Sequence, residues 1–323
     1  MKKLTIRFAA VLLTVFTMVQ SVSAATLLVP VGQVIGIEIG QDQVTVAGFD
    51  ETIGKAAQAA GLKEGDCIVK IDDTQIHSTE DVRRCLHASD GDVDITIIRN
   101  GLQKELELEP VITEEGPKLG VFLRQGITGV GTVTYYDPDS GTFGALGHGV
   151  NDPDGIPVSM REGFAYSARV DSVRKGKAGD PGQLMGAVTS TTPIAALSKN
   201  TLQGIFGKAD VPFTGDALPA AAISEIRPGS AVIRSTIQHG TVQEYSVEIL
   251  KIYPHSGSDG RNLLLRVTDP RLLETTGGIV QGMSGSPIIQ DGKLIGAVTH
   301  VLVNDPTTGD GIFIENMLDA AGL

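Results

Sequence analysis

The C-terminal two thirds of the chain alternates short apolar segments with glycine-containing turns, and this pattern limits the fold most strongly. Within residues 119–323, examples of such segments are Gly129–Tyr136, Gly186–Thr191 and Glu244–Ile252. Short strands at regular spacing are typical of β-sandwiches and β-barrels. The composition agrees, because glycine contributes 40 of the 323 residues and aromatic residues only 4%. We therefore predict a mainly β domain over 119–323.

The first 24 residues have the pattern of a secretory signal. Three basic residues within the first seven precede an apolar run from Phe8 to Val19, and small residues follow. This order predicts a signal peptide with cleavage after Ala24. The run from Leu4 to Val22 is also long enough to act as an uncleaved membrane anchor. Both alternatives predict export across the membrane.

Charge and cysteine usage exclude some function classes. The formal net charge of −12 repels phosphate backbones, so we expect no nucleic-acid partner. The two cysteines, Cys67 and Cys85, lie in no cluster with metal-ligand spacing. We expect neither a metal nor another cofactor, and the sequence leaves open whether the two cysteines pair.

Residues 29–110 are predicted to form one compact α+β unit. Strands are expected at Val34–Ile39 and Val44–Val46, and Ser78 is a suitable N-cap for a short helix that ends at Leu86. Asn100-Gly101 is typical of a tight hairpin turn. The polar segment 111–118 is then interpreted as a linker.

This unit resembles a PDZ domain. The segment Gly61–Ile68 is similar to the Gly-Leu-x-x-Gly-Asp-x-Ile turn of that family. The family's carboxylate-binding loop is similar to the run Val34, Ile35, Gly36 and Ile37. The resemblance implies that these four residues bind a peptide, which adds as a strand to the sheet edge.

The motif Gly282-Met283-Ser284-Gly285-Ser286-Pro287 carries the clearest chemistry. Acyl transfer needs an exposed serine beside a base, and two backbone N–H groups that hold the oxyanion. Flanking glycines allow the required backbone conformation and the close approach of substrate. We predict Ser284 as the nucleophile and the N–H groups of Gly282 and Ser284 as the oxyanion hole.

His148 is the strongest candidate for the general base. It follows an apolar strand and is framed by glycines in Phe143–Gly149. An imidazole titrates close to neutral pH, as a base that later acts as an acid requires. A carboxylate should orient it, and from the residues alone Asp269 and Asp171 both stay open.

Two longer stretches resemble one peptidase family. Gly282–Pro287 and the strands after it are similar to the active-site serine loop of chymotrypsin-like peptidases. The whole stretch Thr268–Pro306, together with Ala145–Gly149, resembles the SpoIVB peptidases of endospore-forming bacteria. This resemblance implies a PDZ domain followed by a chymotrypsin-like double β-barrel, with a triad of His148, Asp269 and Ser284.

The same resemblance implies a role in sporulation. Such a peptidase would be exported to the space between forespore and mother cell and would process itself near its N-terminus. Its protein substrate would be a membrane-bound regulator of an intramembrane protease, whose cleavage releases a late sigma factor.

Two other functions stay open. One is a PDZ-bearing processing protease with a Ser–Lys dyad, for which Lys293 is the example. The other is a PDZ scaffold without catalytic activity. The first predicts an essential lysine and a dispensable His148, and the second predicts that Ser284→Ala keeps full function.

Overall fold

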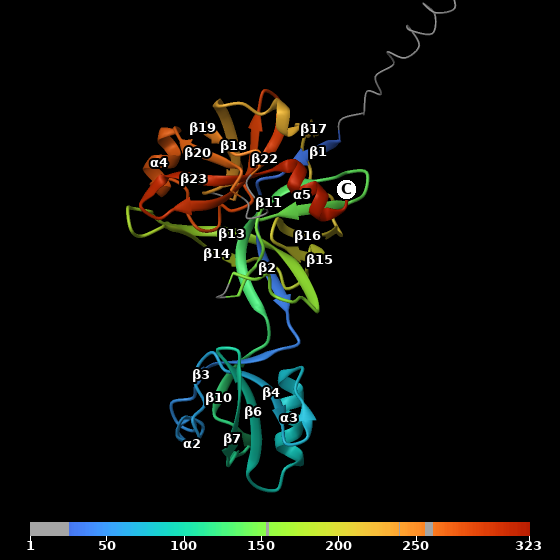
Figure 1. Ribbon diagram of the computed structural model, residues 1–323, viewed down its shortest axis with the longest axis vertical. Coiled ribbons are helices and arrows are strands. Elements are labelled where there is room, and N and C mark those ends of the chain that lie inside the picture. Colours follow the sequence, from blue (N-terminus) through green and yellow to red (C-terminus); the bar gives the residue numbers. More distant parts are fainter. Residues whose placement is uncertain (1–25, 153–154, 239, 256–260) are drawn as a thin grey trace, which may run out of the picture.

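The computed structural model describes residues 26–152, 155–238, 240–255 and 261–323. The predicted signal segment 1–24 lies outside these residues. Strands make up 51% of the described residues and helices 11%, so the predicted mainly β fold is confirmed. Two barrels lie side by side, and a smaller domain is joined to one end of them (Figure 1). Within the described ranges, no helix is long and apolar enough to cross a bilayer.

The first barrel is a ring of six strands in the described chain. In ring order they are β2 (Val34–Gly40), β11 (Ile127–Tyr136), β12 (Thr142–Ala145), β16 (Gly204–Ala209), β15 (Ala195–Thr201) and β13 (Glu162–Arg174). The pairing of β13 with β2 and of β11 with β12 closes the ring. Three further strands extend the sheet: β1 (Leu27–Pro30), β17 (Leu218–Pro219) and β14 (Gln183–Val188). Alternate apolar side chains such as Ile35, Ile37 and Ile39 fill its core.

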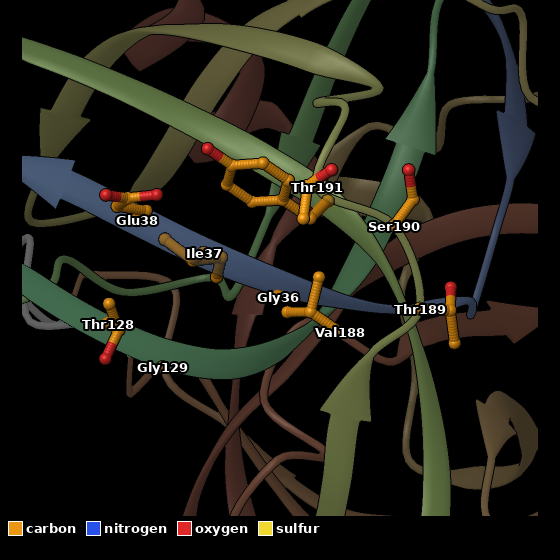
Figure 2. A pocket seen from close by; sticks show the side chains of 10 residues that line it. Gly36, Ile37, Glu38, Thr128, Gly129, Val188, Thr189, Ser190 and Thr191 are labelled. Carbon is orange, nitrogen blue, oxygen red and sulfur yellow. The ribbon is translucent and has the colours of Figure 1, made fainter.

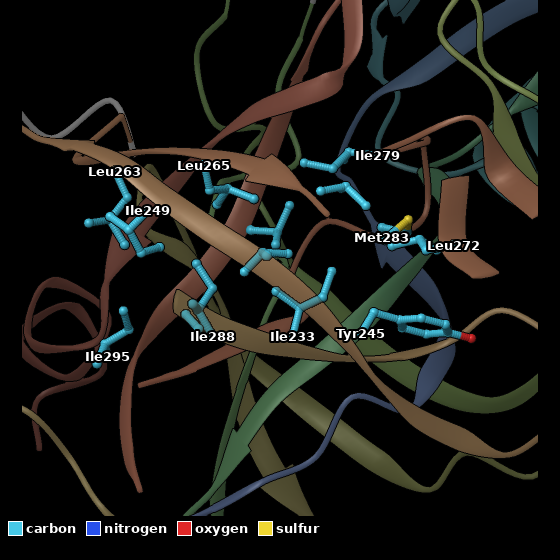
Figure 3. Close-up of a cluster of buried hydrophobic side chains, with 14 of the residues drawn as sticks. Ile233, Tyr245, Ile249, Leu263, Leu265, Leu272, Ile279, Met283, Ile288 and Ile295 are labelled. Carbon is cyan, nitrogen blue, oxygen red and sulfur yellow. The ribbon is translucent and has the colours of Figure 1, made fainter. Parts of the chain in front are cut away.

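The second barrel is closed by six strands of the described C-terminal half. In ring order they are β18 (Gly229–Thr236), β19 (Val242–Ile252), β20 (Leu263–Val267), β23 (Asp305–Phe313), β22 (Lys293–Leu302) and β21 (Pro287–Gln290). Helix α4 (Pro270–Thr276) follows β20, and α5 (Ile314–Ala321) follows β23. Figure 3 shows its core, in which Met283 lies beside Leu272 of α4. Because Met283 is fully buried, it anchors the chain next to Ser284.

The two barrels share a buried apolar interface. Leu28, Tyr135 and Phe206 from the N-terminal side pack with Ala297 and Ile312 of the second barrel. Strand β11 also hydrogen-bonds across this interface to the serine motif, as described below. The second barrel therefore fixes its serine loop against a central strand of the first.

The smaller domain contains a six-stranded sheet and two short helices. The strand order is β10 (Val121–Arg124), β3 (Val44–Phe49), β4 (Cys67–Ile71), β6 (Val93–Arg99) and β7 (Leu102–Leu108), with β5 (Thr74–Gln75) beside β4. The helices are α2 (Lys55–Ala59) and α3 (Thr79–Ala88), and Ser78 caps α3 as predicted. Arg99 forms an ion pair with the buried Asp66. Cys67 and Cys85 are both free thiols.

The position of this domain in the chain corrects two expectations. Val34, Ile35, Gly36 and Ile37 are not its carboxylate-binding loop, because β2 pairs with β11 and β13 in the first barrel. Segment 111–118 is not a linker but the hairpin β8 (Val111–Thr113) and β9 (Gly116–Lys118). The sheet is completed only by β10, so the domain runs from β3 to β10 and is inserted between β2 and β11. An apolar strand with an internal glycine fits a barrel and a PDZ sheet equally well, which is why the pattern misassigned β2.

Candidate active site

The serine motif forms a tight loop between α4 and β21. Gly282 and Gly285 both have positive φ angles, +97° and +96°. A Cβ atom at Gly285 would lie 2.0 Å from the carbonyl oxygen of Thr132 and 2.5 Å from the nitrogen of Leu146. Only glycine therefore fits at position 285 without moving the backbone of the first barrel.

Strand β11 of the first barrel holds this loop from one side. The Thr132 amide donates to the carbonyl of Ser284 at 3.0 Å, and the Thr132 hydroxyl donates to the carbonyl of Gly282 at 2.9 Å. The Thr134 hydroxyl donates to the carbonyl of Gly285 at 2.8 Å. With these carbonyls occupied, the loop has a fixed orientation against β11.

The predicted oxyanion-hole amides are available. Among the described residues, the backbone N–H groups of Gly282 and Ser284 donate to no protein group, whereas those of Met283 and Gly285 are bonded to Val280 and Val298. Amides without an internal partner at a solvent-reachable loop can bind a developing negative charge. This arrangement matches what the sequence motif requires.

His148 comes from the first barrel, directly after β12. Leu146 and Gly147 make a turn with φ values of +69° and +70° that brings the histidine toward the second barrel. A Cβ at Gly147 would lie 2.9 Å from Cγ2 of Thr299, so the two barrels approach closely here. Nδ1 of His148 lies 2.8 Å from the carbonyl oxygen of Gly149, to which it donates. Burial lowers the pKa of His148, so its imidazole is neutral at neutral pH.

Ser284 and His148 line one cavity of about 300 Å³ between the barrels, together with Gln281 and Gly282. The Ser284 hydroxyl donates to the carbonyl oxygen of Thr299 at 2.6 Å and not to His148. The His148 ring contacts the ring of His300, with centroids 5.1 Å apart. The structure thus brings the predicted nucleophile and base into the same cavity without a hydrogen bond between them.

Asp269 lies at the N-terminus of α4, which it caps. Its carboxylate accepts from the side chain and amide of Arg271 and from the amide of Ser246, and it makes no hydrogen bond to His148. The Arg271 guanidinium, together with these amides, lowers the pKa of Asp269 to about 2. Asp171 pairs with Arg169 on the exposed face of β13. Neither carboxylate is bonded to the base in this structure.

Lys293 lies at the start of β22, where its ammonium group forms an ion pair with Glu225. It is not among the residues that line the cavity of Ser284. Within the described ranges, no group of three His, Cys, Asp or Glu side chains has the geometry to hold a metal ion.

A second groove adjoins this cavity on the first barrel (Figure 2). It encloses about 490 Å³, and its lining is mostly apolar and hydroxyl-bearing, with Gly36, Val188 and Thr191 among the residues shown. Ile37 and Gly129 line both spaces, so the groove lies next to the cavity of Ser284. Strand β2, which the sequence pattern assigned to the PDZ sheet, thus lines part of this groove and of the cavity of Ser284.

The inserted domain has its own groove, between α3 and β10, with a volume of about 560 Å³. Leu119, Gly120 and Val121 lead into β10 and line one side, and Val82 and Leu86 of α3 line the other. Because β10 is the edge strand of its sheet, a peptide can add alongside it. The peptide-binding loop was predicted at Val34–Ile37, at the start of the domain, whereas this groove lies beside its last strand, β10.

Comparisons with known proteins agree with this architecture. The profile of the SpoIVB peptidase S55 family matches residues 115–318, and a PDZ profile matches residues 53–99. A protein of Agrobacterium fabrum, whose name describes it as a candidate zinc metalloprotease, is 37% identical over 89 residues, which are 27% of this chain and 22% of that protein. The match therefore spans about a fifth of that relative.

Two solved structures match parts of the chain. The Rv3671c protease of M. tuberculosis in its active form matches with a TM-score of 0.36 and 14% identity, over 60% of this chain and 72% of that one. The PDZ domain of an SdrC-like protein from Listeria monocytogenes matches with a TM-score of 0.22 and 22% identity, over 25% of this chain and 87% of that one. The family profile covers more than half of the chain, and this protein is therefore a PDZ-containing serine peptidase of the SpoIVB peptidase S55 family.

Proposed function

We propose that the chain is an exported serine endopeptidase in which Ser284 is the nucleophile and His148 the general base. The observation that carries this proposal is that each barrel contributes one of the two residues to a single cavity. The unbonded amides of Gly282 and Ser284 supply the oxyanion hole at the same place. The basic and apolar N-terminal pattern supports export.

The local hydrogen bonds support the role of His148 as a base. Because Nδ1–H donates to the carbonyl of Gly149, the lone pair lies on Nε2, which can take the serine proton. When substrate binds, the Ser284 hydroxyl turns from the carbonyl of Thr299 toward His148 and attacks the scissile carbonyl carbon. The proton passes to Nε2 and then to the leaving amine, and water hydrolyses the acyl-enzyme by the reverse transfers. The family resemblance assigns the third position to Asp269.

The PDZ groove supports a protein substrate that is recognised away from the scissile bond. A bound peptide would pair with β10, which is separated from β11 only by Gln125 and Gly126. Strand β11 in turn holds the Ser284 loop through Thr132. The proposed substrates are the chain itself and a membrane-bound regulator of an intramembrane protease, in the sporulation pathway that the family name suggests.

Self-cleavage of the purified chain tests this function. The wild type is compared with Ser284→Ala, His148→Ala and Lys293→Ala by gel electrophoresis and mass spectrometry of the fragments. We expect the wild type and the lysine variant to be clipped and the serine and histidine variants to stay intact. Loss of cleavage in Lys293→Ala with retention in His148→Ala would instead support the Ser–Lys dyad. If the wild type and all three variants stay intact and cleave no candidate substrate, the result would support the alternative of a PDZ scaffold without catalytic activity.

A further inference from the structure

A second histidine lies against His148. The two rings have centroids 5.1 Å apart and are inclined by 33°. His300 belongs to β22, and the residue before it, Thr299, accepts the hydrogen bond of the Ser284 hydroxyl. One short segment of β22 therefore contacts both the nucleophile and the base.

A β-bulge turns His300 toward the active site. Val298 pairs with Gly311 of β23 and His300 pairs with Asp310, so Thr299 is an extra residue in β22. Val298 faces the core of the second barrel. In a regular strand His300 would face the same core, because side chains alternate with a period of two. The bulge moves it to the face between the barrels, and bulges next to active sites commonly redirect a side chain in this way.

Asp310 lies directly across from His300 on β23. Residues directly opposite on antiparallel strands share a face, with Cβ atoms about 5 Å apart. The next outward-facing residue of β23, Ile312, packs at the interface between the barrels. The Asp310 side chain is only 11% exposed, and Oδ2 lies 3.8 Å from Nε of the mostly exposed Arg261. The titratable and charged groups near His300 include His148, Asp310 and, beyond Asp310, Arg261.

We propose that His300, backed by Asp310, is a positioning residue that orients the His148 ring and stabilises its protonated form. This inference rests on the proposed roles of Ser284 and His148. The carboxylate of a triad normally provides this support. Asp269 is engaged by Arg271 and Ser246, whereas the buried Asp310 is aligned with the histidine that contacts the base. The negative charge of Asp310 thereby favours the imidazolium that forms during acyl transfer.

Steady-state kinetics on a peptide that contains the self-cleavage site test the proposal. The variants are His300→Phe, which keeps a ring without ring nitrogens, Asp310→Asn and the double variant. The matched control is Asp305→Asn, an exposed acid on the same strand that bonds only Thr307 and Thr308. We expect each single variant to lower kcat by about tenfold or more at an unchanged KM, and the double variant to lose no more than the worse single one. Asp310→Asn should also move the acid limb of kcat/KM to lower pH, because it removes a charge that favours protonated His148.

The outcomes separate the inference from the function on which it rests. If cleavage depends on Ser284 and His148 but the His300 and Asp310 variants keep wild-type kcat and pH dependence, the positioning role is wrong. If the wild type shows no cleavage that depends on Ser284, the proposed function itself fails. An NMR titration of His148 in a Ser284→Ala background gives a second readout that needs no turnover: Asp310→Asn must lower its midpoint, and an unchanged midpoint overturns the proposal. Should His300→Phe lower the melting temperature, His300→Gln replaces it in both measurements.

Discussion

The hydroxyl of Ser284 donates a hydrogen bond to the main-chain oxygen of Thr299 at 2.6 Å. The carbonyl belongs to the bulged residue of β22, so the same irregularity that redirects His300 also binds the nucleophile. In this arrangement the serine hydroxyl points to a backbone acceptor and not to the base. Turnover therefore requires a rotation about the Ser284 side chain once substrate fills the cavity.

Gly285→Ala should abolish activity through the backbone. The new Cβ would collide with the carbonyl of Thr132 and the amide of Leu146 at a position with φ of +96°. We expect a loss of about 3 kcal/mol of stability and a displaced Ser284 loop. Gly292→Ala is the matched control, since its φ is +75° but no atom lies within 4 Å of the added Cβ. Gly292→Ala should lower the free energy of unfolding by about 1 kcal/mol, which thermal unfolding measures, and should leave peptide cleavage unchanged. Equal losses in both variants would contradict this account.

Arg271→Ala should lower stability in a pH-dependent way. The folded-state pKa of Asp269 is depressed to about 2, so its stabilising contribution is present above pH 4 and is lost as the pH falls toward 2. Because Arg271 is largely exposed, we expect a loss on the order of 1 kcal/mol at pH 7. Chemical unfolding at several pH values measures it. The free energies of unfolding of the variant and the wild type should converge near pH 2. If the variant is still less stable than the wild type at that pH, the loss comes from the packing of Arg271 and not from its charge.

Phe122→Ala should weaken peptide binding by the PDZ domain. Phe122 lies on the edge strand β10, lines the groove and is 59% exposed, so its removal should leave the fold intact. Ile112 of β8 is 78% exposed and lies outside the groove, so Ile112→Ala is the control. We expect about tenfold weaker binding of a peptide that contains the self-cleavage region, by calorimetry, for Phe122→Ala alone. If both variants bind the peptide with equal affinity, the peptide does not bind in the groove beside β10.

Much of the fold follows from local patterns in the sequence. Glycine turns between apolar strands predicted the β-rich C-terminal region, and the glycines around Ser284 predicted its loop. Those signals are local, because a positive φ or a close backbone approach requires glycine at that position. Ser78 was recognised as the cap of α3 because N-capping depends only on the residue just before the helix and the first turn that follows.

The assignments that depend on distant pairing were not readable from the sequence. Strand β2 was placed in the PDZ sheet because its composition does not reveal that its partners, β11 and β13, lie about 90 or more residues later. The bulge at Thr299 leaves no composition signal, so His300 and Asp310 could not be connected to His148. For Asp269, a helix N-cap and a catalytic carboxylate look alike in sequence, and the sequence does not reveal the contacts that this side chain makes with Arg271.

The central claim is that Ser284 is a nucleophile activated by His148, and covalent labelling tests it most directly. The full chain is treated with a fluorophosphonate, which forms a bond from the serine oxygen to phosphorus and releases fluoride, and the labelled peptide is sequenced by mass spectrometry. Ser286 is two residues away but buried and bonded to Ser235, so it serves as an internal control. The account predicts an adduct on Ser284 that is lost in Ser284→Ala and forms far more slowly in His148→Ala. An adduct on Ser286, or labelling of Ser284 at an equal rate in His148→Ala, would contradict it.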